Sequence, residues 1–356
     1  MRIAILGGGH GCYAAAADLA EQGHQIALWR RSASQFGDLV HSKTLQLKDH
    51  AGARAVALDT VTADLGLALE GAELILVFTP AFAQEDIAQA MAPHLQPSQV
   101  VFLAPGTLGS MAMASAARKA GGKSCTWAET GTLPYLARKH DENTIAITIR
   151  AKHLPTGVFP ASETERAIAV IQAAYPCVHA IEDALSGALM NAGPIIHPPL
   201  IIMNAGPLEH FERWDIHNEG TQPAVRRVTD RLDAERIAIR EAFGYAPNHY
   251  PLSDHYNSDK WMYGDAHDRL TDSGDWREKI DLTSHRYMTE DVAYGLGLLV
   301  SMARYSGTPA PLATSLFELG RAVCAGEFLY GSRTLTTLGL ADMPAGSLRQ
   351  LLNDGY

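Results

Sequence analysis

The sequence predicts an α/β protein in which a doubly wound parallel sheet is followed by a mainly α-helical domain. Three observations predict this fold. A chain of 356 residues suggests two domains, at roughly 150 residues each. Short apolar runs alternate with helical stretches in the first half, as in a parallel sheet with helices on both faces. Beyond residue 182 the strand signal fades, so the expected domains are 1–182 and 183–356.

Four short apolar runs make up the predicted parallel sheet, and alanine-rich helical stretches lie between or after them. Gly23 closes the first helix, and a small hairpin and two later strands complete the domain. The strands are expected at 2–6, 24–29, 73–78 and 99–104, the helices at 13–22 and 84–94, the hairpin at 44–47 with 54–58, and the later strands at 144–149 and 177–181.

Helical periodicity dominates the second half. Val225, Leu232 and Ile239 recur at helical spacing, and Pro223 stands near the helix start, where its missing amide is harmless. The polar and aromatic segment 248–276 predicts a long loop with short helices. A ligand site is expected in the cleft between the two domains. The helices are expected at 184–196, 225–243, 289–305 and 312–325.

Charge and hydropathy exclude several classes of protein. The 39 acidic residues against 29 basic ones give a net charge of -10, which disfavours binding to a nucleic-acid backbone. Mean hydropathy is -0.06, and no apolar run approaches the roughly 20 residues of a membrane span, so no membrane association is expected. The chain therefore reads as a globular protein with small-molecule partners.

Cysteine and histidine spacing gives no metal site. The four cysteines lie far apart without a CxxC pair, which fits a reduced compartment. The 15 histidines are scattered, and none shows tight metal-ligand spacing, so no metal is expected. Because the first apolar run begins at once and reads as a strand, without a signal-like leader, a cytoplasmic protein is expected.

A strand, a glycine turn and a helix N-terminus follow one another at the start of the sequence. In this order, free backbone amides and the positive helix end can hold a pyrophosphate. Gly7 makes the tight turn, Gly9 lets the backbone approach the phosphates, and His10 and Gly11 open the helix. Cys12 stands where the third glycine of GxGxxG is expected. The motif predicts dinucleotide binding; the alternative is a glycine turn without ligand.

The end of the second predicted strand indicates the type of dinucleotide. NAD enzymes commonly place a carboxylate there for the ribose 2′-hydroxyl, but this sequence has Arg30, Arg31 and Ser32. Two guanidinium groups and a hydroxyl suit a 2′-phosphate. The sequence therefore favours NADP(H), with NAD(H) as the alternative cofactor. The simpler interpretation is that the two arginines are solvated at the end of a strand and bind no cofactor.

Turn residues follow the third and fourth strands of the predicted sheet. Thr79 and Pro80 follow the third strand, and Pro105 and Gly106 follow the fourth. Ligands of such folds bind at the carboxyl ends of the strands, so these positions are candidates for cofactor contact. Ordinary turn chemistry would use the same residue types.

Two constellations in the second half are candidates for catalysis. His197 lies among apolar residues before two prolines and could exchange protons near neutrality, although a packed histidine is the common alternative. Arg286 could hold a substrate carboxylate, and Asp291 could orient a histidine. Thr289 reads equally well as the N-cap of a helix with an acidic first turn. On one α-helix, Arg286 and Asp291 would be about 140° apart, so a shared face is not expected.

Together these segments resemble the octopine/nopaline (opine) dehydrogenases, in the same order and over nearly the whole chain. The resemblance implies an NAD(P)-binding Rossmann domain and an all-α substrate domain of the octopine-dehydrogenase type. It also implies reductive condensation of the amine of an amino acid with a 2-oxo acid such as pyruvate, and the reverse reaction. The matching segments are the glycine turn, 129–138, 191–199, 219–223 and 286–291.

The resemblance also implies roles for four residues. His197 matches the catalytic histidine of the family, Asp291 its partner, Arg286 the arginine that contacts a substrate carboxylate, and Asn191 an asparagine beside the site. The loop 248–276 is expected to determine specificity for the amino donor, but no pattern in it identifies that amino acid. The helical domain could support a homodimer.

Two other functions remain as alternatives. One is a plain NADP-dependent 2-oxo acid reductase of the ketopantoate reductase type. Such enzymes use a lysine in the helical domain, and no lysine lies between residues 184 and 259. The other alternative is a sensor that binds NADP(H) without turnover.

Overall fold

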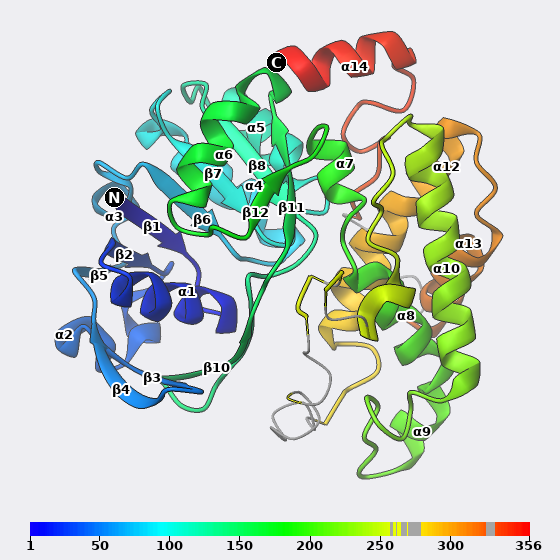
Figure 1. Cartoon of the computed structure of the whole chain (residues 1–356), viewed down its shortest axis with the longest axis horizontal. Coiled ribbons are helices and arrows are strands. Elements are labelled where there is room, and N and C mark those ends of the chain that lie inside the picture. The colour runs from blue at the N-terminus through cyan, green and yellow to red at the C-terminus, as the bar shows by residue number, and fades with distance from the viewer. Residues whose placement is uncertain (257–258, 261, 265–268, 270–278, 325–331) are drawn as a thin grey trace. The chain divides into compact units, whose positions relative to one another are not determined.

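The computed structural model describes the chain except for residues 257–258, 261, 265–268, 270–278 and 325–331 (Figure 1). The described residues form two compact units. One comprises Met1–Ala188 with Gln350–Tyr356, and the other comprises Leu189–Arg349. The division thus falls six residues beyond the one expected from the sequence. The end of the chain joins the first unit, where the ring of Tyr356 packs on Phe159 at a centroid distance of 5.2 Å.

An eight-stranded sheet forms the centre of the first unit, in the order β12-β11-β8-β7-β6-β1-β2-β5. β1 pairs in parallel with both β2 and β6, which confirms the predicted parallel sheet. β11 runs antiparallel to β8, a departure from that prediction. The strands are β1 (Arg2–Leu6), β2 (Gln25–Trp29), β5 (Thr60–Thr62), β6 (Leu74–Val77), β7 (Val100–Leu103), β8 (Thr126–Thr130), β11 (Leu154–Phe159) and β12 (Val178–Ala180).

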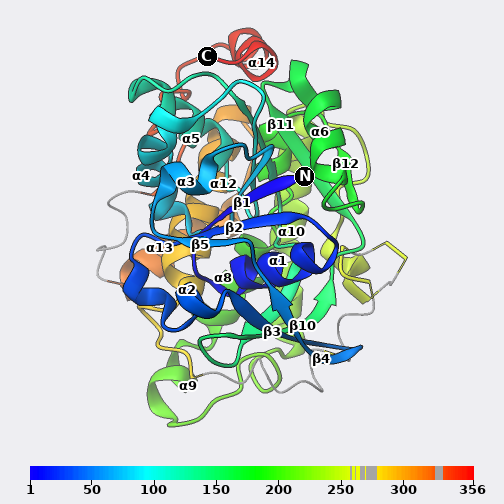
Figure 2. The same cartoon turned by 90° about the vertical axis from the view of Figure 1, so that its left-hand side faces the viewer.

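Helices cover both faces of this sheet. Figure 2 shows α3, α4 and α5 together on one side and α6 on the other. Helix α1 carries the run Ala14–Ala17, whose side chains are fully buried because small residues let the helix approach the strands closely. The helices are α1 (His10–Glu21), η1 (Ala33–Phe36), α2 (Leu39–Ser42), α3 (Leu65–Leu69), α4 (Ala81–Met91), η2 (Ala92–His94), α5 (Gly109–Lys119), η3 (Ala161–Glu163), α6 (Thr164–Gln172) and α7 (Ala184–Ala188).

A second sheet of four strands packs against α1, in the order β4-β3-β10-β9. The predicted hairpin forms its β3–β4 pair, with Thr44 opposite Ala57. The strand predicted at 144–149 also belongs here, where β10 pairs in parallel with β3 and antiparallel with β9. The strands are β3 (Thr44–Asp49), β4 (Gly52–Ala57), β9 (Tyr135–Lys139) and β10 (Thr144–Arg150).

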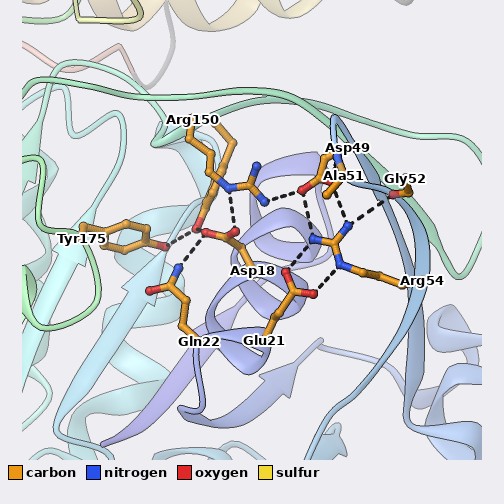
Figure 3. Close-up of polar contacts among 10 residues, drawn as sticks. Asp18, Glu21, Gln22, Asp49, Ala51, Gly52, Arg54, Arg150 and Tyr175 are labelled. Atoms are coloured by element: carbon orange, nitrogen blue, oxygen red, sulfur yellow. Dashed lines mark hydrogen bonds and ion pairs between the residues drawn. The ribbon is translucent and has the colours of Figure 1, made fainter.

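Ion pairs fix α1 to this second sheet (Figure 3). Arg150 on β10 donates from Nε to Asp18 of α1 at 2.7 Å and from Nη2 to Asp49 of β3 at 2.8 Å. Arg54 on β4 also binds Asp49, and its other donors reach Glu21 of α1. The two guanidinium groups, Arg54 foremost, hold the pKa of Asp49 well below its ordinary value. The helix that follows the glycine turn is thereby fixed in place.

The second unit is mainly helical, as predicted. Its longest helix, α10, carries Arg236, which pairs with Asp233 at 2.7 Å and donates to the carbonyl oxygens of Leu189 and His249. The helices are α8 (Gly193–Met203), α9 (Ala205–His210), α10 (Pro223–Ala242), η4 (Leu252–Tyr256), η5 (Tyr287–Leu296), α12 (Gly297–Ser306), α13 (Pro311–Val323) and α14 (Ala345–Asp354), whose second half belongs to the first unit.

Three predicted helices differ from the structure. The helix expected at 184–196 is two helices, α7 and α8, because the chain turns at Asn191, whose side chain accepts a hydrogen bond from the amide of Gly193 at 3.0 Å. The helix expected at 289–305 begins earlier, and its first part is the π-helix η5. Residue 325 of the fourth helix and much of the loop predicted at 248–276 lie outside the described residues.

One segment among the described helices is long and apolar enough to cross a membrane, by length and composition alone. It spans Ala184–Met203 and has a mean hydropathy of 1.2, which corrects the expectation that no such run exists. The structure buries 72% of this window. The segment is therefore a core element made of α7 and α8.

Candidate active site

The glycine turn lies between β1 and α1 in the first unit. Gly7 has φ +132°, which residues with a side chain rarely adopt. Gly9 is exposed and is the N-cap of α1; no described atom lies within 4 Å of the position that a Cβ would take there. No side chain accepts a hydrogen bond from the N-terminal amides of α1 as a cap. This arrangement fits a phosphate group.

Cys12 explains how the turn forms without a third glycine. Its thiol is fully buried beneath Gly7 and lies 3.5 Å from the carbonyl oxygen of Phe78 and 3.6 Å from that of Leu6. Burial raises the pKa of this thiol to about 12. The side chain therefore supports the turn from below and faces away from a ligand. Gly11 packs against Leu133, whose side chain would have to move for a Cβ there.

Arg30 lies directly against the glycine turn. A Cβ on Gly8 would meet the end of the Arg30 side chain, which would have to move aside. The guanidinium group also approaches the hydroxyl of Tyr13, at 3.5 Å from Nη1. Arg31 is exposed and Ser32 is half-buried, with its hydroxyl 2.8 Å from that of Ser34.

The ends of β6 and β7 differ in what they offer to a ligand. Thr79 lies beside Gly7, and its buried hydroxyl has no hydrogen-bond partner among the described residues, whereas Pro80 is exposed. An unpartnered buried hydroxyl at this edge fits a bound cofactor. Pro105 is half-buried and Gly106 is buried.

Gly106 packs against a carboxyl group that the sequence did not single out as a site residue. A Cβ on Gly106 would clash with Glu129, which is completely buried at the end of β8. Glu129 accepts a hydrogen bond of 2.6 Å from the hydroxyl of Ser110. The glycine is therefore explained by packing as well as by turn chemistry.

In the second unit the structure brings His197 and Asp291 together. Nδ1 of His197, on α8, lies 2.7 Å from Oδ2 of Asp291, on η5. A carboxylate only accepts hydrogen bonds, so Nδ1 carries the hydrogen and Nε2 is the nitrogen that can exchange a proton with a ligand. Asp291 is buried and His197 keeps 17% of its side chain exposed, so the imidazole is accessible.

The π-helix differs from the α-helical geometry on which the expected separation of Arg286 and Asp291 rested. Hydrogen bonds in a π-helix run from residue i to residue i+5, so a turn holds more residues than in an α-helix, and residues five positions apart lie closer to one face than the roughly 140° of an α-helix. Arg286 is helical and directly precedes η5, and its exposed side chain contributes a positive charge that acts on His197. Thr289 lies inside this helix and is not its N-cap, because the helix begins three residues earlier.

Asn191 and Gly193 hold the carboxylate side of the pair. The side chain of Asn191 binds the amide of Gly193, and a Cβ on Gly193 would clash with Oδ1 of Asp291. Gly295 on η5 packs in the same way against Pro194 of α8. Close contact between these two helices thus sets the distance from His197 to Asp291.

Opposing effects set the protonation of His197. Burial is the largest and lowers its pKa below the ordinary value; Asp291 raises it, and the charges of Arg286 and His285 lower it again. The net shift is downward, so the imidazole is mainly neutral near pH 7.

Two residues at this site were not found from the sequence. The ring of Tyr287 stacks on His197 at 3.8 Å, and its hydroxyl lies 3.1 Å from Nε2 of His217. Tyr287 stands inside the 286–291 motif, so its position in that motif was an available signal. His217 precedes the matched segment 219–223 and has no local signal in the sequence.

Comparisons with known proteins agree with these two units. The family model described as NAD/NADP octopine/nopaline dehydrogenase, alpha-helical domain, matches residues 180–324. The model described as ketopantoate reductase PanE/ApbA matches residues 3–127. An opine dehydrogenase from Arthrobacter sp. (strain 1C) is 28% identical over 354 residues, which cover 97% of each chain.

Two solved structures share the fold. One is octopine dehydrogenase with NADH and pyruvate, at TM-score 0.72 and 16% identity, covering 98% of each chain. The other is NADP+-bound yersinopine dehydrogenase, at TM-score 0.68 and 15% identity, covering 98% of this chain and 97% of that one. Both confirm the predicted arrangement of a parallel-sheet domain followed by a helical domain.

The fold, the open glycine turn and the matched family models define an NAD(P)-dependent oxidoreductase. Within this class the chain is similar to the opine dehydrogenases.

Proposed function

We propose that this protein joins the amine of an amino acid to the carbonyl carbon of a 2-oxo acid of the pyruvate type and reduces the product, reversibly. One observation carries the proposal: a histidine–aspartate pair with an adjacent exposed arginine lies inside the octopine-dehydrogenase-type helical domain. The product would be an N-(carboxyalkyl) amino acid. A relative named opine dehydrogenase, matched over nearly the full length, supports this chemistry.

The proposed reaction proceeds through an imine. The amine nitrogen attacks the carbonyl carbon, and the adduct loses water to give an imine. The hydride that reduces the imine carbon would come from a bound nicotinamide cofactor, and the nitrogen takes a proton. His197 acts through Nε2: as imidazolium it gives a proton to the departing oxygen or to the imine nitrogen, and as imidazole it takes one in the reverse direction. Asp291 keeps the proton on Nδ1 and stabilises the imidazolium.

Arg286 is the proposed partner of a substrate carboxylate. Its exposed guanidinium group can form two parallel hydrogen bonds with a planar carboxylate. Both substrates carry a carboxylate, so a fixed cation beside the proton donor orients the reacting carbonyl group. Asn191 contributes by holding the start of α8, the helix that carries His197.

The glycine turn and the strand ends are the proposed holders of the cofactor. The amides that begin α1 would take the pyrophosphate, Thr79 offers its hydroxyl, and Arg30 offers its charge at the end of β2. Because no carboxylate follows β2 directly and Arg30 lies on the turn, NADP(H) is proposed over NAD(H). None of the four cysteines is in a disulfide, which supports the proposed cytoplasmic location.

The test is NADPH oxidation with pyruvate and a pool of amino acids, with each substrate alone as a control. Oxidation only when both are present is expected, and dividing the pool identifies the amino donor. Oxidation with the 2-oxo acid alone would replace the proposal by a simple reductase, the function that the ketopantoate reductase match over 3–127 supports. NADPH binding without oxidation in any mixture would favour a sensor.

The catalytic role of His197 has its own test. His197→Asn should keep the fold and NADPH binding but lose nearly all turnover, because asparagine cannot exchange the proton. Retained turnover in this variant would remove His197 from the mechanism.

A further inference from the structure

Lys139 reaches the glycine turn from outside the parallel sheet. It ends β9 in the four-stranded sheet, and its backbone amide donates to Nδ1 of His10 at 2.9 Å. Its ammonium nitrogen lies 3.6 Å from the ring centroid of Tyr13, on the first turns of α1. The side chain is half-buried, so it is ordered against the ring yet accessible from solvent.

Arg30 contacts the same tyrosine. Its Nη1 lies 3.5 Å from the hydroxyl of Tyr13 and donates to the carbonyl oxygen of Gln35, while Nε and Nη2 have no hydrogen-bond partner among the described residues. Tyr13 is fully buried and serves as a common support for the two cations. Two side chains from different sheets therefore place two positive charges at one end of α1.

The two cations are not neutralised by an ion pair. Within the described part of the chain, no carboxylate lies within 4.0 Å of the charged nitrogens of either Arg30 or Lys139. Burial and the charge of Arg30 lower the pKa of Lys139, and the more distant Glu142 and Asp141 only partly oppose this. Two like charges held together without a counter-ion repel each other, and a bound anion would relieve that repulsion.

The position of Lys139 indicates which anion fits. The turn between β9 and β10 carries Glu142, and a Cβ on Gly37 would clash with the Glu142 carboxylate. This turn therefore touches the segment that follows β2 and contains Arg30 and Gln35. In dinucleotide-binding folds the end of β2 is where the 2′-position of the adenosine ribose is recognised. The pyrophosphate belongs at the helix amides, which Gly9 leaves open.

We propose that Lys139 is a specificity-determining residue that acts with Arg30 on the 2′-phosphate of NADP(H). The two cations converge from separate sheets on one phosphate, which NAD(H) lacks. The inference rests on the proposed use of NADP(H). It is independent of the identity of the amino acid and the 2-oxo acid.

Equilibrium binding tests the proposal without catalysis. Isothermal titration calorimetry on the whole protein would compare NADP+, NAD+, 2′,5′-ADP and 5′-ADP, with neither substrate present. The variants are Lys139→Gln, which removes the charge, and Lys139→Arg, which keeps it. Lys48→Gln is the matched control, because Lys48 is an exposed lysine on β3 of the same sheet.

Loss of one charged contact to a phosphate should raise the Kd for NADP+ and 2′,5′-ADP by about tenfold or more in Lys139→Gln. The Kd for NAD+ and 5′-ADP should change less than about twofold. Lys139→Arg should restore most of the preference, and Lys48→Gln should bind as the wild type does. If both charges bind one phosphate, the effects of Arg30→Ala and Lys139→Gln should be non-additive in the double variant.

Three results would overturn the inference. Equal weakening of NADP+ binding and NAD+ binding in Lys139→Gln would show that Lys139 contacts a phosphate common to both cofactors. Unchanged binding in a folded Lys139→Gln protein would make it a structural lysine. Tighter binding of NAD+ than of NADP+ by the wild-type protein would show that the protein does not prefer NADP(H). Since no substrate enters these titrations, a failure of the proposed condensation reaction would be seen separately, in the turnover assay.

Discussion

The ring of Tyr287 lies flat on the imidazole of His197, with centroids 3.8 Å apart and an interplanar angle of 11°. The imidazole is thus held on two sides, by this stack and by the hydrogen bond from Nδ1 to Asp291. Because Tyr287 and Asp291 belong to the same π-helix, one element determines both the rotation and the tautomer of the proposed acid–base group.

Tyr287→Leu should lower kcat between about 2-fold and 10-fold, the range expected from loss of an aromatic pair that orients a reacting group. The KM for NADPH should stay unchanged, because Tyr287 lies in the helical unit. Tyr287→Phe is the matched control, since it keeps the stacked ring and loses only the hydroxyl that approaches His217. Steady-state kinetics of the three proteins decides this. Equal kcat in the leucine variant and the wild type would contradict a positioning role.

The pH dependence should follow the lowered pKa of His197. Oxidation of the N-(carboxyalkyl) amino acid needs the neutral imidazole as a base, so kcat/KM should rise with pH through this pKa and level off above it. The rise should be centred below about 6.5, the ordinary histidine value, because burial favours the neutral form. Profiles of kcat/KM against pH measure this directly.

Asp291→Asn should move the same rise to still lower pH, because the carboxylate is the group that raises the pKa of His197. The plateau should also fall, by at least about 100-fold, since an amide neither fixes the tautomer nor stabilises the imidazolium. A shift of the midpoint to higher pH would show that Asp291 does not act on His197 as a carboxylate.

Gly295→Ala should destabilise the helical unit and lower activity together. The added methyl group would enter Pro194 and push η5 away from α8, which lengthens the contact between Asp291 and His197. Overpacking of this kind costs about 1–3 kcal/mol. Gly206→Ala is the control, because no described atom lies within 4 Å of the Cβ position in this other helical glycine. Thermal unfolding and kcat would be measured for both. A stable, fully active Gly295→Ala protein would disprove the close fit.

The ion-pair cluster of Figure 3 should make the first unit sensitive to acid. Asp49 has a pKa below its ordinary value in the folded state, so its stabilisation is present above that ordinary value, near pH 4, and declines as the pH falls below it. Asp49→Asn should therefore lower the free energy of unfolding by about 2 kcal/mol at neutral pH. The difference from the wild type should shrink toward pH 3.

Asp86→Asn is the control for that experiment, because Asp86 is an exposed carboxylate on α4 that forms no ion pair with another described residue. Denaturant unfolding at several pH values gives the comparison. A gap between wild type and Asp49→Asn that does not depend on pH would show that packing, and not charge, carries the effect.

Local patterns allowed much of the fold to be predicted. The first strand is observed at Arg2–Leu6 as expected, and the glycine turn and α1 follow it, because strand, turn and helix signals there are all local. β11 was missed because Pro155 and Gly157 interrupt its pattern with residues that are uncommon in strands. β9 overlaps the segment 129–138, which was noted only for its resemblance.

The site was predicted less completely, for a physical reason. His197 and Asp291 were named from the sequence, but their contact depends on helices that are far apart along the chain. The estimate of 140° between Arg286 and Asp291 assumed α-helical geometry, and the sequence carries no signal for a π-helix. Lys139 and Arg30 reach the same tyrosine, Tyr13, only because two separate sheets pack on α1, so neither residue type nor spacing indicates this arrangement.

The wide helical turn that carries Arg286, Tyr287 and Asp291 makes the spacing of this motif as important as its letters. On an ordinary α-helix, the same five-residue spacing would put Arg286 and Asp291 about 140° apart, on different faces. A change of helix type at this point would therefore preserve every chemical group and still separate the arginine from the aspartate. A homologous sequence that keeps all three residues should not be assigned this reaction from its residues alone.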